Sequence, residues 1–454
     1  MARRRLFNKL NIPAKLDSET RKYMPLFGTW LLDMAIVLNW HKPTSPRYWP
    51  DIFNDNDFCA LTGMTPMDEI DGEDDSKKTI TLIQCRKVLL NQREQLQKMK
   101  LSPQLPLFKN VELLAKLLEL SEADKAVITF AAGLSMFPEF NNAIRGANQK
   151  VAMQSFCRLM ALLTGINESE MSRACALDSP LVSSGLVRIK RQSCDLEDKI
   201  SLMHGLEGVM QTAHEKIDDL VACFMRRAAA PSLTLDNFPH LRTDRTMLTE
   251  YLGNALLEKT IGVNVLLHGK PGVGKNEFVQ ALAAELNVDL YEVSYSDQDG
   301  DPIKGTARLQ AYSLCQRLLA RDQNAMLLFD EVEDVVGSGS SMFSHFFGGD
   351  EDDEQTGSNR NGKAWINRTL ENNQVPAIWI SNKISQIDNA YLRRFDFSVG
   401  FPVPPHSVRI SMARHHLDCF EPPQNWVERL AANEAITPAQ FERAAKVARI
   451  ASSG

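Results

Sequence analysis

The residues with the clearest chemical meaning form a glycine-rich run between an apolar segment and an amphipathic one. In order they are Gly269, Lys270, Pro271, Gly272, Val273, Gly274, Lys275 and Asn276. Glycines let a backbone curl so that its N–H groups converge on phosphate oxygens, and a following helix directs the positive end of its dipole at them. A lysine at the end of such a loop reaches the β- and γ-phosphates. The run therefore predicts a nucleotide-binding loop that uses all eight residues.

Asn276 stands where this pattern has Ser or Thr, whose hydroxyl binds Mg²⁺. An asparagine carbonyl is also a hard oxygen ligand, although its amide is bulkier and places the oxygen differently. We therefore expect Asn276 to be a metal ligand, and nucleotide binding is a safer expectation than fast turnover.

The second motif is acidic: Asp330 and Glu331 follow four apolar residues, 326–329. Acidic residues at the carboxyl end of a buried strand lie at the edge where open α/β sheets bind ligands. We expect Asp330 to hold Mg²⁺ through water and Glu331 to act as the general base that polarises the attacking water. The alternative is an acidic pair that only caps a helix.

Further candidates are an asparagine after an apolar strand and two adjacent arginines later in the chain. Asn382 comes directly after a third apolar strand, where its amide can orient the attacking water. The adjacent Arg393 and Arg394 can stabilise transition-state charge on the nucleotide of a neighbouring subunit. The alternative for these arginines is a surface ion pair with Asp388 or Asp396.

The elements that must position these residues alternate along the chain. Apolar strands are predicted at 264–268, 289–294, 326–329 and 377–380, with helices at 276–286 and 306–320. This alternation predicts an α/β domain over residues 231–404, with a parallel sheet covered by helices on both faces. Residues 1–230 are predicted to be mostly α-helical, and residues 405–454 to supply a helical lid, in whole or in part.

The helical region contains two more specific patterns. A helix should begin at Ser121, with Asp124 as its capping partner. Residues 151–191 combine two helices with a short strand, which is the order of a winged helix. The basic residues on that wing are Arg188, Lys190 and Arg191. Contact with DNA is one interpretation, and a protein-packing module with a solvated basic edge is the favoured alternative.

The composition narrows the class of protein. The chain has 454 residues, and 51 Lys and Arg against 57 Asp and Glu give a formal net charge of −6, which disfavours a generically basic nucleic-acid binder. The eight cysteines form no Cys-x-x-Cys pair, so reduced thiols are expected rather than a zinc ribbon. The longest apolar stretch, 30–38, is too short to cross a bilayer. We therefore expect a cytoplasmic protein without a membrane partner.

Taken in order, these motifs resemble those of the AAA+ ATPases, and the resemblance covers about residues 235–404. Residues 269–275 are similar to the Walker A motif, Asp330 and Glu331 to Walker B, Asn382 to sensor 1, and Arg393 and Arg394 to arginine fingers. The string 392–396 looks most like the AAA clade proper, and the helical N-terminal region like its bacterial members.

The resemblance implies a P-loop domain with a five-stranded parallel sheet, ATP and Mg²⁺ as cofactors, and a homo-oligomer in the form of a hexameric ring. It also implies hydrolysis used to remodel or regulate a protein partner. Pore loops would fall near 296–305 and in the aromatic, acidic insertion 337–363, for which a solvated loop is an equal alternative. Two other functions remain open: an ATP-dependent assembly switch with weak hydrolysis, motivated by Asn276, and a DNA-associated ATPase.

Overall fold

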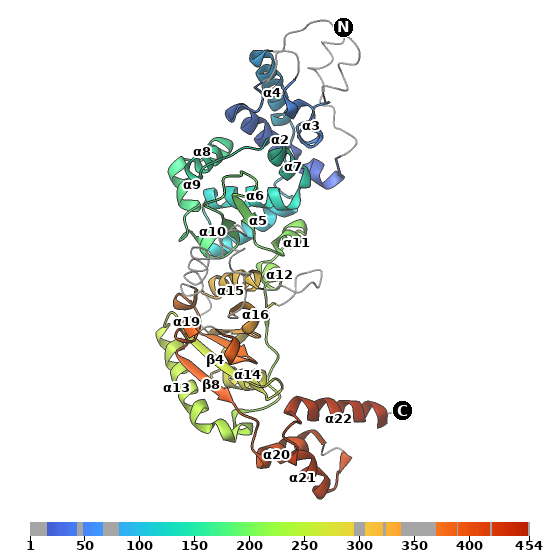
Figure 1. Cartoon of the computed structure of the whole chain (residues 1–454), viewed down its shortest axis with the longest axis vertical. Helices are drawn as coiled ribbons and strands as arrows, with labels where there is room; N and C mark the ends of the chain where they lie inside the picture. The colour runs from blue at the N-terminus through green and yellow to red at the C-terminus, as the bar shows by residue number, and fades with distance from the viewer. Residues whose placement is uncertain are drawn as a thin grey trace. The chain divides into compact units, whose positions relative to one another are not determined.

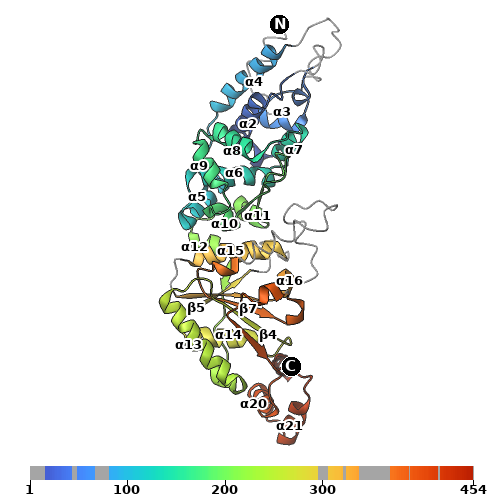
Figure 2. The ribbon, with the colours of Figure 1, turned by 60° about the vertical axis from the view of Figure 1, so that its left-hand side comes forward.

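The computed structural model describes residues 16–42, 49–66, 81–294, 305–320, 324–336, 369–387, 389–417 and 420–452 (Figures 1 and 2). The chain divides into two compact units, Met1–Leu220 and Val221–Gly454. The predicted insertion 337–363, and all of the predicted pore loop 296–305 except Gly305, lie outside the described residues.

The first unit is built mainly of helices, as its sequence periodicity predicts. They are α2 (Ser18–Val37), α3 (Asn56–Thr62), α4 (Leu82–Gln97), α5 (Pro106–Leu118), α6 (Glu122–Met136), α7 (Pro138–Gly146), α8 (Met153–Thr164), α9 (Glu168–Ala174), α10 (Pro180–Ser183), α11 (Leu206–Gln211) and α12 (Ile217–Val221). Aromatic side chains hold several of them together. The ring of Phe27, on α2, lies 5.0 Å from that of Phe137 and 4.8 Å from that of Phe140, so one buried residue joins α2 to the start of α7.

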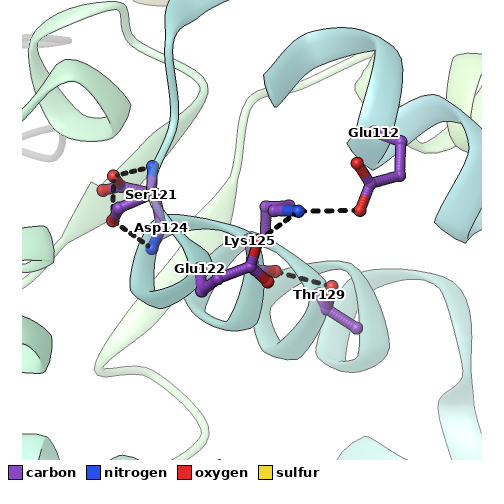
Figure 3. A network of polar contacts seen from close by, with 6 residues as sticks. All are labelled: Glu112, Ser121, Glu122, Asp124, Lys125 and Thr129. Carbon is purple, nitrogen blue, oxygen red and sulfur yellow. Dashed lines mark hydrogen bonds and ion pairs between the residues drawn. The ribbon is translucent and has the colours of Figure 1, made fainter. Parts of the chain in front are cut away.

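The N-terminus of α6 is fixed by a network of polar contacts (Figure 3). The Ser121 hydroxyl accepts from the N–H of Asp124 at 3.2 Å, and the Asp124 carboxylate accepts from the N–H of Ser121 at 2.9 Å. The predicted start of this helix and its capping pair are thus confirmed. Lys125 adds ion pairs to Glu112 at 2.8 Å and to Glu122 at 2.6 Å, and these bonds raise the pKa of its ammonium group. The pair to Glu112 also ties α6 to α5.

Residues 151–191 form α8, α9, α10 and the strand β1 (Val187–Ile189), which pairs antiparallel with β2 (Ile200–Leu202). The basic residues of this hairpin are largely engaged within the protein. Arg191 donates to the carbonyl oxygen of Cys175 at 3.1 Å, and burial lowers the pKa of the Arg188 guanidinium to about 10. Arg188 is thus half-buried and Arg191 is bonded within the protein, so two of the three basic side chains of this edge contact the protein itself.

The second unit contains a six-stranded sheet in the order β3-β5-β6-β7-β4-β8. Its strands are β3 (Met225–Arg227), β4 (Asn264–Gly269), β5 (Asp289–Val293), β6 (Ala325–Phe329), β7 (Ala377–Ser381) and β8 (Phe397–Phe401). Strands β5, β6, β7, β4 and β8 run parallel to one another, which confirms the five-stranded parallel sheet. The sixth strand, β3, pairs antiparallel with β5 and begins ahead of residue 230, inside the region predicted to be helical.

Helices cover both faces of this sheet. On one face, Val265, Leu267 and Ile380 pack with Phe278 of α14 (Lys275–Glu285) and with residues of α13 (Arg242–Glu258). On the other, the ring of Trp379 lies 4.6 Å from that of Tyr312, on α15 (Thr306–Leu319). The alternation of side chains along each strand divides the apolar runs between the two faces, as a doubly covered parallel sheet requires.

Short helices follow strands β6 and β7, and three more follow β8. They are α16 (Glu333–Val336), the 3-10 turn η5 (Ile384–Gln386), α19 (Asn389–Leu392), α20 (His406–Leu417), α21 (Gln424–Ala432) and α22 (Pro438–Ser452). The last three pack on one another around Ala413, Val427 and Phe441, and they make up the helical region for which a lid is predicted. Within the described ranges, no helix is long and apolar enough to cross a membrane.

Candidate functional site

The glycine-rich loop connects the carboxyl end of β4 with the first turn of α14. Gly272 and Gly274 have φ angles of 78° and 94°, in the left-handed region that side chains rarely adopt. Gly274 is also the N-cap of α14, so the loop delivers the chain directly to the positive end of that helix. Lys270 and Pro271 are exposed on the loop and Val273 is buried beneath it. All eight predicted loop residues therefore lie along one strand–loop–helix connection.

Gly269 is the position in the loop where a side chain is least tolerable. Its φ is 153°, and an added Cβ would collide with the carbonyl oxygen of Phe401 on β8. We expect Gly269→Ala to destabilise the protein by about 2–4 kcal/mol, from backbone strain together with overpacking. The thermal unfolding midpoint without nucleotide should fall by roughly 5–15 °C.

Gly253 offers a matched control in the same unit. It lies inside α13, where an added Cβ would be 3.5 Å from a methyl group of Leu286, an ordinary contact. Because glycine weakens a helix interior, Gly253→Ala should stabilise the protein by about 0.5–1 kcal/mol. Equal shifts in the two variants would contradict the close approach of β4 and β8 at Gly269.

Lys275 reaches back from the first turn of α14 under the loop. Its side chain is only 5% exposed, and its ammonium donates to the carbonyl oxygens of Gly269 at 2.7 Å and Lys270 at 3.0 Å and to Oδ1 of Asn382 at 2.9 Å. Burial lowers the pKa of Lys275, while the charges of Asp330 and Glu333 act in the opposite direction. This ammonium is a buried positive charge that joins the loop to the end of β7.

The two predicted metal ligands lie against each other. Nδ2 of Asn276 donates to Oδ2 of Asp330 at 2.9 Å, and Oδ1 of Asp330 accepts from the N–H of Glu331 at 2.8 Å. Magnesium in nucleotide sites is held by one or two protein oxygens and completes its octahedron with phosphate oxygens and water. A carboxylate and an amide oxygen beside this glycine-rich loop fit that donor set. In the part of the chain that the structure describes, no group of three or more His, Cys, Asp or Glu side chains could hold a metal ion by itself.

Glu331 follows Asp330 directly after β6, and Asn382 follows the neighbouring strand β7. Glu331 is exposed and has a φ of 54°, a left-handed conformation that turns the chain sharply after β6. Such strained residues are concentrated at functional sites. Asn382 follows β7, and its side chain is committed to Lys275. A γ-phosphate entering the loop would therefore meet the Lys275 ammonium and the Asn382 amide together.

Two site residues escaped the sequence analysis. Arg308, on α15, is 3% exposed, donates to the carbonyl oxygen of Asp330 at 2.7 Å and stacks over the ring of Phe329 at 4.5 Å. Glu333 accepts from the N–H of Asn382 at 3.0 Å through Oε1. The signal for Glu333 was present, because the acidic run after β6 extends beyond Glu331. No local pattern marks Arg308.

The two predicted arginines differ from each other. Arg394 forms an ion pair with Glu371 of the same chain, and its N–H donates to the carbonyl oxygen of Tyr391. Arg393 is exposed on the surface. The sequence suggested a surface ion pair of these arginines with Asp396 or Asp388. Arg394 does form a surface ion pair, but its partner is Glu371. Asp388 lies outside the described residues.

Segments from both sides close around the loop. A Cβ on Gly272 would be 2.8 Å from Oγ1 of Thr437, and the N–H of Ala439 donates to the carbonyl oxygen of Gly272 at 3.5 Å, so the lid helix α22 begins beside the loop. On another side, a Cβ on Gly274 would be 3.3 Å from the ring of Phe238. The loop therefore lies between the lid and the segment that precedes α13.

Comparison with known proteins identifies a match to this part of the chain. Residues 265–403, from β4 to just beyond β8, match the ATPase family associated with various cellular activities (AAA). The matched range contains the glycine-rich loop, the acidic pair, Asn382 and both arginines.

Individual relatives are similar to parts of this chain. A spastin from Naegleria gruberi is 26% identical over 230 residues, which are 48% of this chain and 38% of that protein. Proteasome-activating nucleotidase 1 of Halobacterium salinarum is 27% identical over 177 residues, 35% of this chain and 39% of that protein. The chain thus spans less than two-fifths of the length of the curated relatives it matches. A solved HORMA:CdnC:Trip13 complex from E. coli MS115-1 contains a chain that is 16% identical, with a TM-score of 0.34, covering 47% of this chain and 81% of its own.

Proposed function

Because residues 265–403 form a domain of the AAA ATPase family, we propose that this chain binds ATP with Mg²⁺ and hydrolyses it to remodel or regulate a protein partner. The observation that carries the proposal is the position of the Lys275 ammonium. It is buried under the glycine-rich loop and donates to Oδ1 of Asn382 at 2.9 Å. One positive charge therefore contacts both the loop and the end of β7. Burying an ammonium group is unfavourable for folding. The buried position of Lys275 is therefore better explained by phosphate binding than by stability.

The roles of the other residues follow from their positions around this charge. Asp330 and Asn276 would hold the magnesium ion, which would neutralise charge on the phosphates. Glu331, exposed at the same edge, takes a proton from the attacking water as general base. Asn382 orients that water beside the γ-phosphate. All eight loop residues contact the nucleotide in this proposal, Lys270 through its main chain alone, because its side chain is exposed.

A steady-state phosphate-release assay on the pure full chain with ATP and Mg²⁺ tests the proposal. We expect turnover that depends on magnesium. Tight ATP binding with no phosphate release would favour the alternative, an ATP-dependent assembly switch. One observation favours that alternative, because the Asn276 amide donates to Asp330 at 2.9 Å and would have to exchange this bond for a metal contact. Absence of both binding and release would overturn the proposal.

We also propose that the chain acts as a homo-oligomer, a hexameric ring, in which Arg393 reaches the nucleotide of a neighbour. Its exposure supports this role, whereas Arg394 is engaged with Glu371. Arg393→Ala should lower kcat about 100-fold or more, because an arginine finger stabilises charge only in the transition state. Arg394→Ala, the matched control, removes an exposed ion pair worth less than about 1 kcal/mol and should leave kcat nearly unchanged.

Mixing two inactive variants tests whether the arginine acts between subunits. A ring containing both Arg393→Ala and Glu331→Gln chains has some sites where an intact Glu331 meets an intact Arg393 from its neighbour. Phosphate release should therefore reappear on mixing, although each variant alone is nearly inactive. If the mixture stays inactive while both variants assemble, Arg393 does not act in trans.

A further inference from the structure

Two contacts tie the turn after β6 to the end of β7. The N–H of Val332 donates to the carbonyl oxygen of Ile380 at 3.0 Å, which extends the pairing of the strands by main-chain atoms. One residue further on, Oε1 of Glu333 accepts from the N–H of Asn382 at 3.0 Å. The second contact depends on a side chain, so it can be removed by substitution without changing the strands.

The position of the Glu333 carboxylate lowers the stability of the folded protein. Its Oε2 is buried and, within the described ranges, has no hydrogen-bond partner. Leaving a buried acceptor unsatisfied is unfavourable by about 1–3 kcal/mol. Glu333 lies between the turns that follow β6 and β7. Its unfavourable burial is better explained by a role in the site than by a contribution to the fold.

The contact leads directly to the phosphate-binding lysine. Glu333 holds the main chain of Asn382, and the side chain of Asn382 holds the Lys275 ammonium at 2.9 Å. The charge of Glu333 also acts on Lys275, in the direction that keeps the ammonium protonated. These three residues come from α16, the end of β7 and the first turn of α14, so their contacts fix three elements relative to one another.

We propose that Glu333 is a positioning residue, which sets the Asn382 amide at the phosphate site by accepting from its main-chain N–H. This inference rests on the proposed function for its kinetic consequence, but not for the hydrogen bond itself. Without the bond, the turn at Asn382 is free to rotate its amide away from Lys275. The attacking water then loses its orientation, while the loop that binds the nucleotide keeps its shape.

Three substitutions of Glu333 separate this role from others. Glu333→Ala removes the acceptor, and Glu333→Asp shortens the side chain by one methylene, so neither reaches the N–H of Asn382. Glu333→Gln keeps an acceptor oxygen at the same reach and is the rescue variant. We expect kcat for phosphate release to fall about tenfold or more in the Ala and Asp variants, in line with misplacement of a positioned group, with the KM for ATP within about threefold of wild type. The Gln variant should stay close to wild type.

Hydrogen exchange in the nucleotide-free protein provides a readout that does not depend on catalysis. The amide of Asn382 should exchange about tenfold faster in the Ala and Asp variants than in wild type, and at nearly the wild-type rate in the Gln variant. Glu331→Gln is the matched control, because it should abolish hydrolysis without changing exchange at Asn382.

The outcomes distinguish the two proposals. Wild-type kcat and wild-type exchange in Glu333→Ala would overturn the role of Glu333 and leave the ATPase proposal intact. Faster exchange at Asn382 with an unchanged kcat would also overturn it, because the bond would then be merely structural. If the wild-type protein releases no phosphate, the ATPase proposal fails, and unchanged exchange would still refute the bond. If Glu333→Ala does not fold, the Asp and Gln pair carries the same test.

Discussion

Lys275→Met is expected to weaken nucleotide binding about 100-fold while leaving the nucleotide-free protein almost as stable as wild type. Lys275 is only 5% exposed and burial lowers the pKa of its ammonium, so the fold gains little from the charge itself. Methionine fills nearly the same volume without that desolvation. It leaves three acceptors with one partner fewer, the carbonyl oxygens of Gly269 and Lys270 and Oδ1 of Asn382, and the two effects offset each other to within about 1–2 kcal/mol.

The loss of binding should be large because the ammonium is a charged group facing the phosphates. We expect the Kd for ATP to rise about 100-fold, which corresponds to about 2.7 kcal/mol. At a nucleotide concentration of 100 times the wild-type Kd, bound ligand stabilises the wild type by about 2.7 kcal/mol and the variant by only about 0.4 kcal/mol. Thermal unfolding with and without ATP and Mg²⁺ measures this difference directly.

Lys270→Met is the matched control for this experiment. Lys270 lies in the same loop, but its side chain is exposed and contributes only its carbonyl oxygen to Lys275. Its nucleotide-induced stabilisation should match that of wild type. A wild-type shift in Lys275→Met would mean that this ammonium does not meet the phosphates, and the proposed function would fail with it.

The parts of the fold that the sequence predicts best are those with strong local signals. The central strands β6 and β7 are nearly continuous apolar runs that are buried along their whole length. Helix α6 begins at a Ser–Asp capping pair that satisfies two N–H groups within four residues. The strand β3 was missed because its sequence, Met-Arg-Arg, has no apolar alternation. It is a strand only because it pairs with β5 at the edge of the sheet, where both arginines form ion pairs with acidic residues of β5.

The same distinction holds in the site. The glycine-rich loop and the acidic pair are encoded in consecutive residues, so their types and order suffice. Arg308 and Glu333 act through contacts with Asp330 and Asn382, which lie 22 and 49 positions away in the chain. Only the packing of α15 on the sheet and the neighbouring ends of β6 and β7 create those contacts. No periodicity in the sequence can predict them.

Glu331→Gln is expected to stop hydrolysis without weakening nucleotide binding. Glutamine has the same shape but cannot accept the proton of the attacking water, and loss of a general base lowers kcat by about 10²- to 10⁴-fold. The side chain is exposed, and Gln meets the same backbone strain at a φ of 54° as Glu does, so the unfolding free energy should change by less than about 0.5 kcal/mol. Phosphate release and the ATP-induced shift in the unfolding midpoint measure the two effects on one sample.

Glu258→Gln, at the exposed end of α13, makes the same chemical change away from the site and should have wild-type kcat. The decisive comparison is between Glu331→Gln, which should still bind ATP, and Lys275→Met, which should bind it only weakly. Lys275→Met should lose binding and hydrolysis together, whereas Glu331→Gln should lose only hydrolysis, because one charge acts on the ground state and the other only in the transition state. If Glu331→Gln turned over ATP at the wild-type rate, the base would have to be sought elsewhere on the same edge of the sheet. If it lost ATP binding as well, the carboxylate would be part of the binding site.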